Sequence, residues 1–154
     1  MTKSQILIYE LIKSRDEIDD KTKLAKLEYF CDFIHYAFNN EPISQKDIIY
    51  TKQKQGLLAR SLTNDLLALK SSGLIEESPR YHYRIKKNAT VNLSAKEKKT
   101  INYVIEKYGN LSYDELVDIC HSQVPYLATK DGAVAEFFTA YNLVDEYPDY
   151  GTRS

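Results

Sequence analysis

Residues 94–126 read SAKEKKTINYVIEKYGNLSYDELVDICHSQVPY, and this stretch says most about how the chain folds. Ser94 and Glu97 have the spacing of a capping box, in which a hydroxyl and a carboxylate bond the free backbone amides at a helix start. Ser112 and Glu115 repeat this spacing after a Tyr-Gly-Asn link. We therefore predict two capped helices joined by a short turn.

Hydrophobic residues recur every three or four positions elsewhere, which is the periodicity of helices with one buried face. This pattern predicts helices over about 4–14, 21–39 and 57–72, a short one starting at 44–47, and a last one from about 131. The helix over 21–39 is apolar on two sides, which predicts burial between neighbours. Its polar line is Glu28, Asp32 and His35. In the last helix, the side chains expected to point inward are Val134, Phe137, Phe138 and Tyr141.

Residues 74–87 have the alternation of a two-stranded β-hairpin, with Tyr81, Tyr83 and Ile85 on one face. The expected fold class is mainly α: a helical domain with a winged-helix-like part and one small two-stranded β-hairpin. We expect a single domain over residues 1–144 and a flexible C-terminal tail over residues 145–154.

The composition is that of an ordinary soluble globular protein, with 43% hydrophobic and 28% charged residues among 154. No run of about eighteen apolar residues occurs, so no membrane span is predicted. The first residues lack the apolar core and cleavage site of a signal peptide, and the expected location is therefore cytoplasmic.

Two cysteines, Cys31 and Cys120, fall inside predicted helices and are expected to be reduced and buried. Cys31 lies one helical turn before His35, and Cys120 is adjacent to His121, so a zinc site across two helices is an alternative. The chain has no C-x-x-C or H-E-x-x-H spacing, and we expect no metal and no cofactor.

The formal net charge of −1 conceals an uneven distribution. Residues 1–43 carry six basic and eight acidic side chains, residues 44–99 twelve and five, and residues 100–154 three and nine. The net charges of these segments are therefore −2, +7 and −6. A basic middle and an acidic end are typical of a nucleic-acid surface, of two parts that attract each other, or simply of solvated faces.

Catalytic groups are sparse in this chain. Only three histidines are present, and the sequence has no G-x-S-x-G, P-loop or G-x-G-x-x-G motif. We therefore predict that the protein is a binding protein and not an enzyme. A small enzyme or metal protein is an alternative that ranks third, after the two functions described next.

The second alternative is a winged-helix-type DNA-binding transcriptional regulator, because the predicted order of elements occurs in such proteins. Basic side chains bind phosphates, and the candidates are Lys52, Lys54, Arg60, Arg80 and Arg84. Thirteen tyrosines favour protein binding instead, since tyrosine is enriched at interfaces.

Two blocks of the chain resemble the Panacea domain family, which includes SocA-like antitoxins. The block TKLAKLEYFCDF, residues 22–33, is similar to the family's K-L-x-K-L-x-Y-F helix. The block 93–126 is similar to its L-T-x-x-E, K-Y-G-x-L-S-x-x-E-L and H-x-x-x-P-W motifs, with Tyr126 in place of tryptophan. Lys54-Gln-Gly56 stands where the family has K-Y-G-P, and the resemblance covers roughly residues 20–130.

The resemblance implies a bacterial or phage-associated antitoxin that neutralises a cognate protein toxin by direct binding. Some family members resemble proteolytic adaptors, which makes a AAA+ protease a further expected partner, whereas DNA is a partner only under the second alternative. The expected partner-binding residues are exposed parts of Tyr29, His35, Tyr36, Gly56, His121, Pro125 and Tyr126. The alternative is that Tyr29 and Tyr36 belong to the core and that His121 and Pro125 only fix a helix end.

Overall fold

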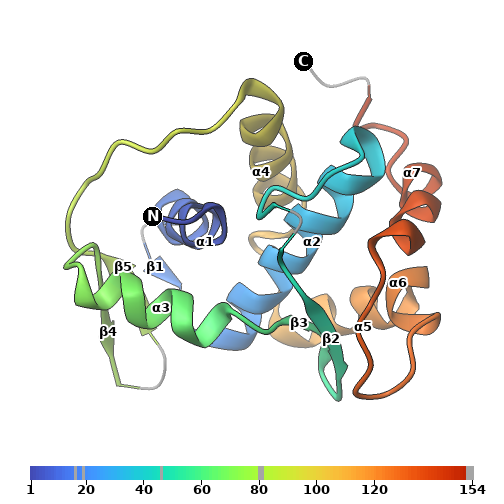
Figure 1. Ribbon diagram of the computed structural model, residues 1–154, viewed down its shortest axis with the longest axis horizontal. Helices are drawn as coiled ribbons and strands as arrows, with labels where there is room; N and C mark the ends of the chain where they lie inside the picture. Colours follow the sequence, from blue (N-terminus) through green and yellow to red (C-terminus); the bar gives the residue numbers. More distant parts are fainter. Residues whose placement is uncertain (16, 19, 46, 80–81, 152–154) are drawn as a thin grey trace.

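The structure is a computed structural model that describes residues 1–15, 17–18, 20–45, 47–79 and 82–151 (Figure 1). Its helices are α1 (Lys3–Ser14), α2 (Lys21–Asn39), α3 (Leu62–Ser71), α4 (Ala95–Tyr108), α5 (Tyr113–Ser122), α6 (Val124–Leu127), the 3₁₀ helix η1 (Phe137–Asn142) and α7 (Leu143–Glu146). Helices make up most of the regular structure, so the predicted mainly α fold class is confirmed.

The strands form two small antiparallel sheets. Strands β4 (Ile75–Ser78) and β5 (His82–Ile85) are the two halves of the predicted hairpin, and β1 (Glu17–Ile18) adds a third strand beside β5. Tyr81, which we expected in the hairpin, lies outside the described residues. A second hairpin, β2 (Tyr50–Gln53) and β3 (Gly56–Ala59), was not predicted.

Helix α2 is the centre of the molecule, and α1, α4, α5, α7 and η1 pack around it (Figure 1). The Asp20 carboxylate caps its first turn by accepting a hydrogen bond from the backbone amide of Thr22 at 2.7 Å. The predicted polar line of this helix does not face solvent. Glu28, Asp32 and His35 are only 0%, 0% and 2% exposed, because the surrounding elements leave α2 no open side.

Helices α4 and α5 begin as the sequence predicts. Ser94 and Glu97 form a reciprocal capping box, with N···O distances of 3.1 and 2.8 Å. Ser112 and Glu115 form the second box, with distances of 3.2 and 3.1 Å. These boxes confirm the two capped helices and fix where each one starts.

The β2–β3 hairpin lies between two predicted helices, and β3 includes residues 57–59, where we predicted the start of the helix over 57–72. Ser44 and Asp47 lie in turns and Gln45 has no regular structure, where we predicted the start of a short helix. Helix α3 starts at Leu62 rather than at 57. The outer edge of β2 is bound by a distant segment: Lys52 donates its backbone amide to the carbonyl of Ala133, and Ala135 donates to that of Tyr50, both at 2.9 Å. This pairing keeps residues 50–53 extended. It joins segments that are far apart in the sequence, so the local sequence pattern does not predict it.

The segment after residue 131 is a loop, the 3₁₀ helix η1 and the single turn α7, instead of one long helix. Phe137 packs against the core as predicted. Val134, Phe138 and Tyr141 do not point inward but are 41%, 62% and 52% exposed. The reason is that a 3₁₀ turn and a strand-like stretch present side chains with a different periodicity from an α-helix.

Tyr147 and Tyr150, in the segment that we predicted to be a flexible tail, pack against the rest of the molecule. Tyr147 and Tyr150 are 1% and 4% exposed, and Tyr150 stacks on Phe38 with ring centroids 4.2 Å apart. Its hydroxyl also shares a hydrogen bond of 2.6 Å with Thr100. These contacts attach the segment to α2 and α4, and residues 152–154 lie outside the described part of the chain.

Candidate partner-binding site

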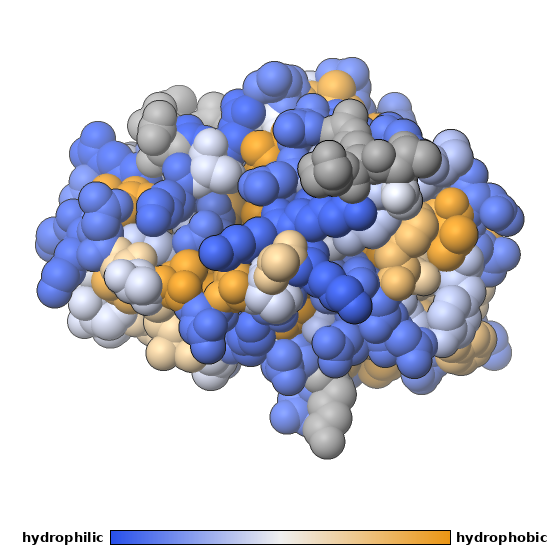
Figure 2. All heavy atoms as spheres, turned by 90° about the horizontal axis from the view of Figure 1, so that it is seen from above, coloured by the Kyte–Doolittle hydropathy of each residue, from blue (hydrophilic) through white to orange (hydrophobic). Residues whose placement is uncertain are grey.

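Exposed apolar side chains gather in the C-terminal part of the molecule. Of the described residues, eight large hydrophobic side chains are exposed, and five of them lie between residues 127 and 144. These five form what we call the C-terminal apolar face: Leu127, Val134, Phe138, Tyr141 and Val144. Helix η1 packs against both α6 and α7, and these three helices contribute four of the five residues. Figure 2 shows apolar surface on the right-hand part of the molecule, the end where Figure 1 places α6 and α7. Such a cluster is typical of a protein-binding surface.

Tyr36 lies at the edge of this face and joins it to α2. Its ring stacks on Phe137 at a centroid distance of 5.4 Å and contacts Tyr141 at 5.6 Å. Phe137 also stacks on Phe33 in the core at 4.6 Å. Because Phe137 takes the inward position, the adjacent Phe138 points outward. The structure therefore brings one predicted site residue, Tyr36, next to the C-terminal apolar face.

His121 and Tyr126 also lie together, at the junction of α5 and α6. Their rings are stacked at 4.2 Å with 15° between the planes, and both side chains are half-buried. The Lys52 ammonium lies 4.0 Å from the Tyr126 ring centroid and donates to the carbonyl of Thr129 at 2.9 Å. Since Tyr126 directly precedes Leu127, this stack borders the C-terminal apolar face.

Pro125 and Tyr29 have structural positions. Pro125 is buried in the first turn of α6, where proline suits a helix start, and its carbonyl accepts from the Thr129 hydroxyl at 2.7 Å. Tyr29 is 0% exposed, so the expectation of an exposed contact there does not hold. Its hydroxyl donates to the Gln123 side-chain oxygen at 2.7 Å, and the Gln123 amide donates to the Tyr147 hydroxyl at 2.6 Å. Gln123 thus links α2, α6 and α7, and no sequence motif had marked it.

His35 is likewise a core residue rather than an exposed contact. It is 2% exposed, and its Nδ1 shares a hydrogen bond of 2.7 Å with the Thr100 hydroxyl. Burial lowers the pKa of His35 to about 4, so the imidazole is neutral at pH 7. Its role is to connect α2 with α4.

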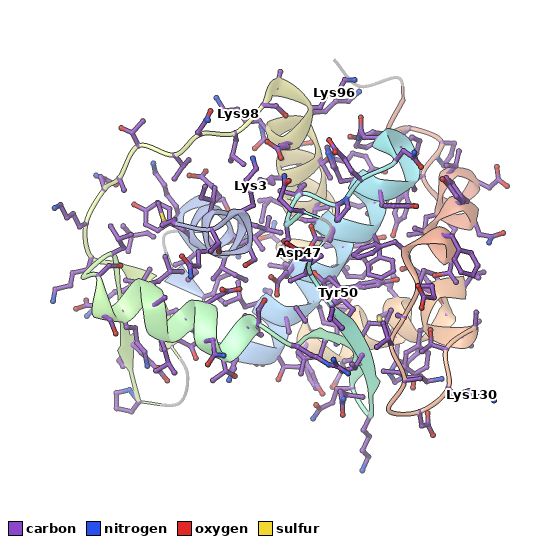
Figure 3. All side chains as sticks on the ribbon, viewed as in Figure 1. Lys3, Asp47, Tyr50, Lys96, Lys98 and Lys130 are labelled. Atoms are coloured by element: carbon purple, nitrogen blue, oxygen red, sulfur yellow. The ribbon has the colours of Figure 1, made fainter. Side chains whose placement is uncertain are left out.

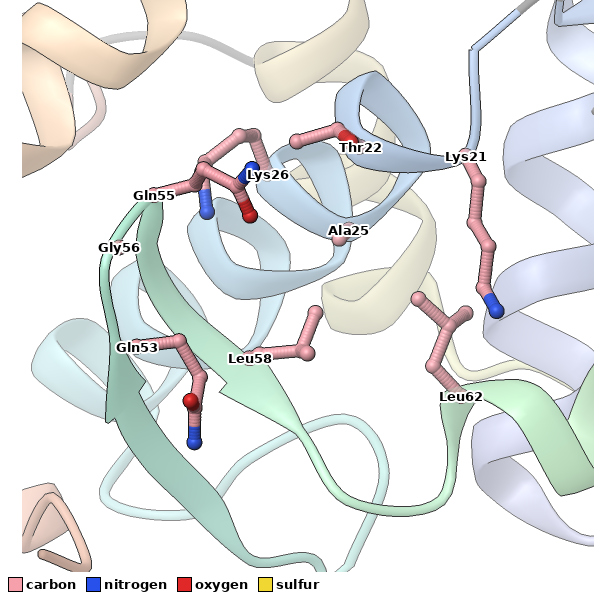
Figure 4. Close-up of a pocket in the computed structure, with 9 residues that line it drawn as sticks. All are labelled: Lys21, Thr22, Ala25, Lys26, Gln53, Gln55, Gly56, Leu58 and Leu62. Atoms are coloured by element: carbon pink, nitrogen blue, oxygen red, sulfur yellow. The ribbon is translucent and has the colours of Figure 1, made fainter. Parts of the chain in front are cut away.

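Gly56 is the first residue of β3, and its backbone angle φ is +130°. Residues other than glycine rarely adopt this angle. A Cβ atom there would lie 2.6 Å from the Lys26 ammonium and 3.0 Å from the Cys120 sulfur. Figure 4 shows Lys26 extending from α2 towards this turn, and Lys26 is only 1% exposed. The sequence contains Lys26 within the family-like helix motif, but nothing in the pattern indicates its burial.

Two buried carboxylates lie beneath the hairpin. Asp32 accepts hydrogen bonds from the Tyr50 hydroxyl at 2.7 Å and from the Ser44 backbone amide at 2.9 Å. Figure 3 labels Tyr50, the first residue of β2. Burial raises the pKa of Asp32 to about 6. Glu28 is fully buried, and neither of its oxygens has a hydrogen-bond partner among the described residues. Burial, then the charges of Asp32 and Asp65, raise the pKa of Glu28 well above its ordinary value.

Comparison with known proteins identifies a family for this chain. The family model described as "Antitoxin SocA-like, Panacea domain" matches residues 24–126. The chain belongs to the SocA-like Panacea domain family. The match confirms the resemblance seen in the sequence. No curated protein and no solved structure matches the chain.

Within this Panacea domain, the matched segment runs from α2 to the middle of α6. It contains every predicted partner-binding residue, from Tyr29 to Tyr126. The C-terminal apolar face lies entirely after it, between residues 127 and 144. The face is therefore built by the segment that follows the family-defining part of the chain.

Basic residues proposed for DNA binding in this Panacea domain are partly neutralised. The Arg84 guanidinium is 2.5 Å from a Glu76 carboxylate oxygen, and the Lys52 ammonium is 3.7 Å from an Asp131 oxygen. The remaining candidates are Lys54 and Arg60, which are exposed, and Arg80, which lies outside the described residues. Two of the four described candidates therefore lie beside a carboxylate, which reduces the positive charge that they offer to a phosphate.

Cys31 and Cys120 are free, buried thiols, as predicted. Within the described ranges of the Panacea domain, no group of three or more His, Cys, Asp or Glu side chains could hold a metal ion. No helix in the described part of the chain has the length and hydrophobicity needed to cross a membrane.

Proposed function

We propose that this protein is a cytoplasmic antitoxin that neutralises a protein toxin by binding it directly, without catalysing a reaction. The observation that carries the proposal is the C-terminal apolar face in a chain of the SocA-like antitoxin family. Tyr36, His121 and Tyr126, which border the face, complete the proposed binding surface.

The exposure of the face supports a binding role. Leu127 and Phe138 are each 62% exposed, and Tyr141 is 52% exposed. Covering one such side chain with a partner would contribute on the order of 1–2 kcal/mol, on the usual area scale for apolar burial. Aromatic side chains near the centre of an interface also tend to contribute most of its energy.

The charge distribution supports a basic partner surface. Residues 100–154, which include the whole C-terminal apolar face, carry a net charge of −6. Complementary charge speeds the encounter of two proteins and restricts the choice of partner. We further propose, from the family resemblance, that the bound toxin is delivered to a AAA+ protease.

Co-expression tests the proposal. A neighbouring small open reading frame is expressed with and without this protein, and the number of surviving cells is counted. We expect the neighbour to be toxic alone and harmless with the wild-type protein. Phe138→Asp should abolish protection by placing a charge in the interface. The control is Leu67→Asp on α3, which changes a side chain of comparable exposure, 50%, away from the face.

Two results would contradict direct neutralisation by this face. One is a neighbour that stays toxic in the presence of wild-type protein at equal expression. The other is full protection by Phe138→Asp together with complexes of unchanged affinity in pull-down. In the same cells, the half-life of the toxin tests the delivery step, because an adaptor shortens it whereas a simple mask does not.

A further inference from the structure

A small pocket of about 120 Å³ lies between the first turns of α2, the β2–β3 hairpin and the start of α3 (Figure 4). Its polar lining consists of Lys21, Thr22, Lys26, Gln53 and Gln55. No carboxylate belongs to this lining in the described part of the chain. The ionisable side chains of this described lining are therefore both lysines, and the pocket is positively charged.

The Lys26 ammonium is the unusual group in this pocket. Lys26 is only 1% exposed, yet among the described residues no hydrogen-bond acceptor or carboxylate pairs with its ammonium. Burial lowers the pKa of Lys26, so its charged form is disfavoured in the folded protein and would be stabilised by a nearby negative charge. A residue of this kind is expected to have a counter-charge in the working state of the protein.

The nearest ionisable group cannot supply that counter-charge. The Cys120 sulfur also lies beside Gly56, but burial raises the pKa of its thiol, so the thiol is neutral at pH 7. The Leu57 backbone amide also bonds the sulfur. Gly56 itself leaves the space that the ammonium occupies, since a Cβ there would lie 2.6 Å from Lys26 Nζ.

The pocket suits one carboxylate better than a phosphate. Phosphate sites at helix starts use several free backbone amides, but here the Asp20 carboxylate already binds the amides of Thr22 and Lys23. The other walls are aliphatic and are formed by Ala25, Leu58 and Leu62. A short methylene chain that ends in a carboxylate matches both the aliphatic walls and the Lys26 ammonium.

We propose that this pocket, the Lys26 pocket, binds the carboxylate of an aspartate or glutamate side chain of the partner protein. Lys26 would pair with the carboxylate, while Thr22 and Gln55 would donate hydrogen bonds to it. That the carboxylate belongs to a partner protein rests on the proposed function. The hairpin connects the two surfaces, because β2 also pairs with the segment at 133–135 that leads to the C-terminal apolar face.

Sodium acetate is the probe for the pocket itself, using the full-length protein with ¹³C-labelled lysines. We expect the Lys26 side-chain resonances to shift saturably, with a dissociation constant on the order of 10 mM for so small a ligand. Lys26→Met should lose the accompanying shift of the Gly56 amide. Lys23→Met, which removes a charge from the same helix outside the pocket, should keep it.

Each outcome of the titration decides the proposal. No saturable shift of Lys26 with acetate would overturn it. A larger shift with inorganic phosphate, at matched ionic strength, would also overturn it and indicate a phosphate-bearing ligand instead. Lys26→Met should remain folded by circular dichroism, because methionine keeps the aliphatic stem and removes the buried charge.

The toxin-protection assay separates this inference from the proposed function. Lys26→Met should weaken the complex with the toxin at least tenfold, whereas Lys23→Met should leave its affinity within twofold. Wild-type protection with equal affinity for both variants would refute the Lys26 pocket and leave the antitoxin function standing. Acetate binding by a protein that protects against no toxin would refute the antitoxin function and leave the carboxylate-binding pocket standing.

Discussion

At the scale of single residues, the stability of the fold depends on buried polar side chains that form hydrogen bonds with one another. Tyr29, Gln123 and Tyr147 form a chain of hydrogen bonds of 2.7 and 2.6 Å through the centre, and Tyr108 extends it by sharing a 2.7 Å bond with Tyr147. A buried polar group that loses its partner keeps the unfavourable desolvation without the bond. Removing one member should therefore affect stability more than its size suggests.

Tyr29→Phe tests this chain. The change removes only the hydroxyl, and it leaves the buried Gln123 oxygen without a donor. We expect the free energy of unfolding to fall by about 1–3 kcal/mol, measured by urea denaturation. Tyr141→Phe is the matched control, because its hydroxyl bonds Asn40 at the exposed surface, and it should change stability by about 0.5 kcal/mol or less. Equal losses in both variants would show that the buried chain has no special energetic role.

At the scale of elements, the β2–β3 hairpin is fixed by the packing of its turn. Gly56→Ala should lower the free energy of unfolding by about 3 kcal/mol, because the backbone at φ +130° is strained for alanine and its Cβ meets Lys26 and Cys120. Gly73→Ala is the control: it has φ +76°, with nothing within 4 Å of the added Cβ, and should lose about 1 kcal/mol. A comparable loss in the two variants, measured by thermal unfolding, would mean that the turn is loosely packed.

The same hairpin shows where sequence reasoning succeeds and where it stops. The boxes at Ser94 and Ser112 are local, since each joins residues three apart, and both helices were predicted correctly. The hairpin depends instead on Ala133 and Ala135, about eighty residues away, whose bonds to β2 leave no local signal. Long-range pairing of this kind overrides local propensity.

The candidate site follows the same rule. The order of family motifs identified Tyr36, His121 and Tyr126, which border the exposed surface, and it also selected Tyr29, which belongs to the core. Periodicity alone cannot tell which face of α2 is covered when helices surround it on every side. The burial of Lys26 was missed for that reason, because a lysine in a helix ordinarily extends into solvent.

At the scale of the whole molecule, two buried titratable groups give stability opposite dependences on pH. The folded-state pKa of Asp32 is raised from 3.8 to about 6, so the stability that it contributes is present below pH 3.8 and is lost as pH rises through 6. The folded-state pKa of His35 is lowered from 6.5 to about 4, so its contribution is present above pH 6.5 and is lost as pH falls towards 4. Glu28, whose pKa is also raised, acts in the same direction as Asp32.

Variants at these two positions should therefore diverge from the wild type in opposite directions between pH 7 and pH 4. His35→Gln removes the loss of stability that the wild type suffers on acidification. Its free energy of unfolding relative to wild type should therefore rise by about 2–3 kcal/mol between pH 7 and pH 4. Asp32→Asn removes a group that is stabilised by protonation, so its relative stability should fall by about 3 kcal/mol over the same range. Urea denaturation at pH 4, 5, 6 and 7 measures both differences. If all three proteins gave parallel curves, neither group would titrate differently in the folded and unfolded states, and the buried environment of α2 could not be as dry as its packing indicates.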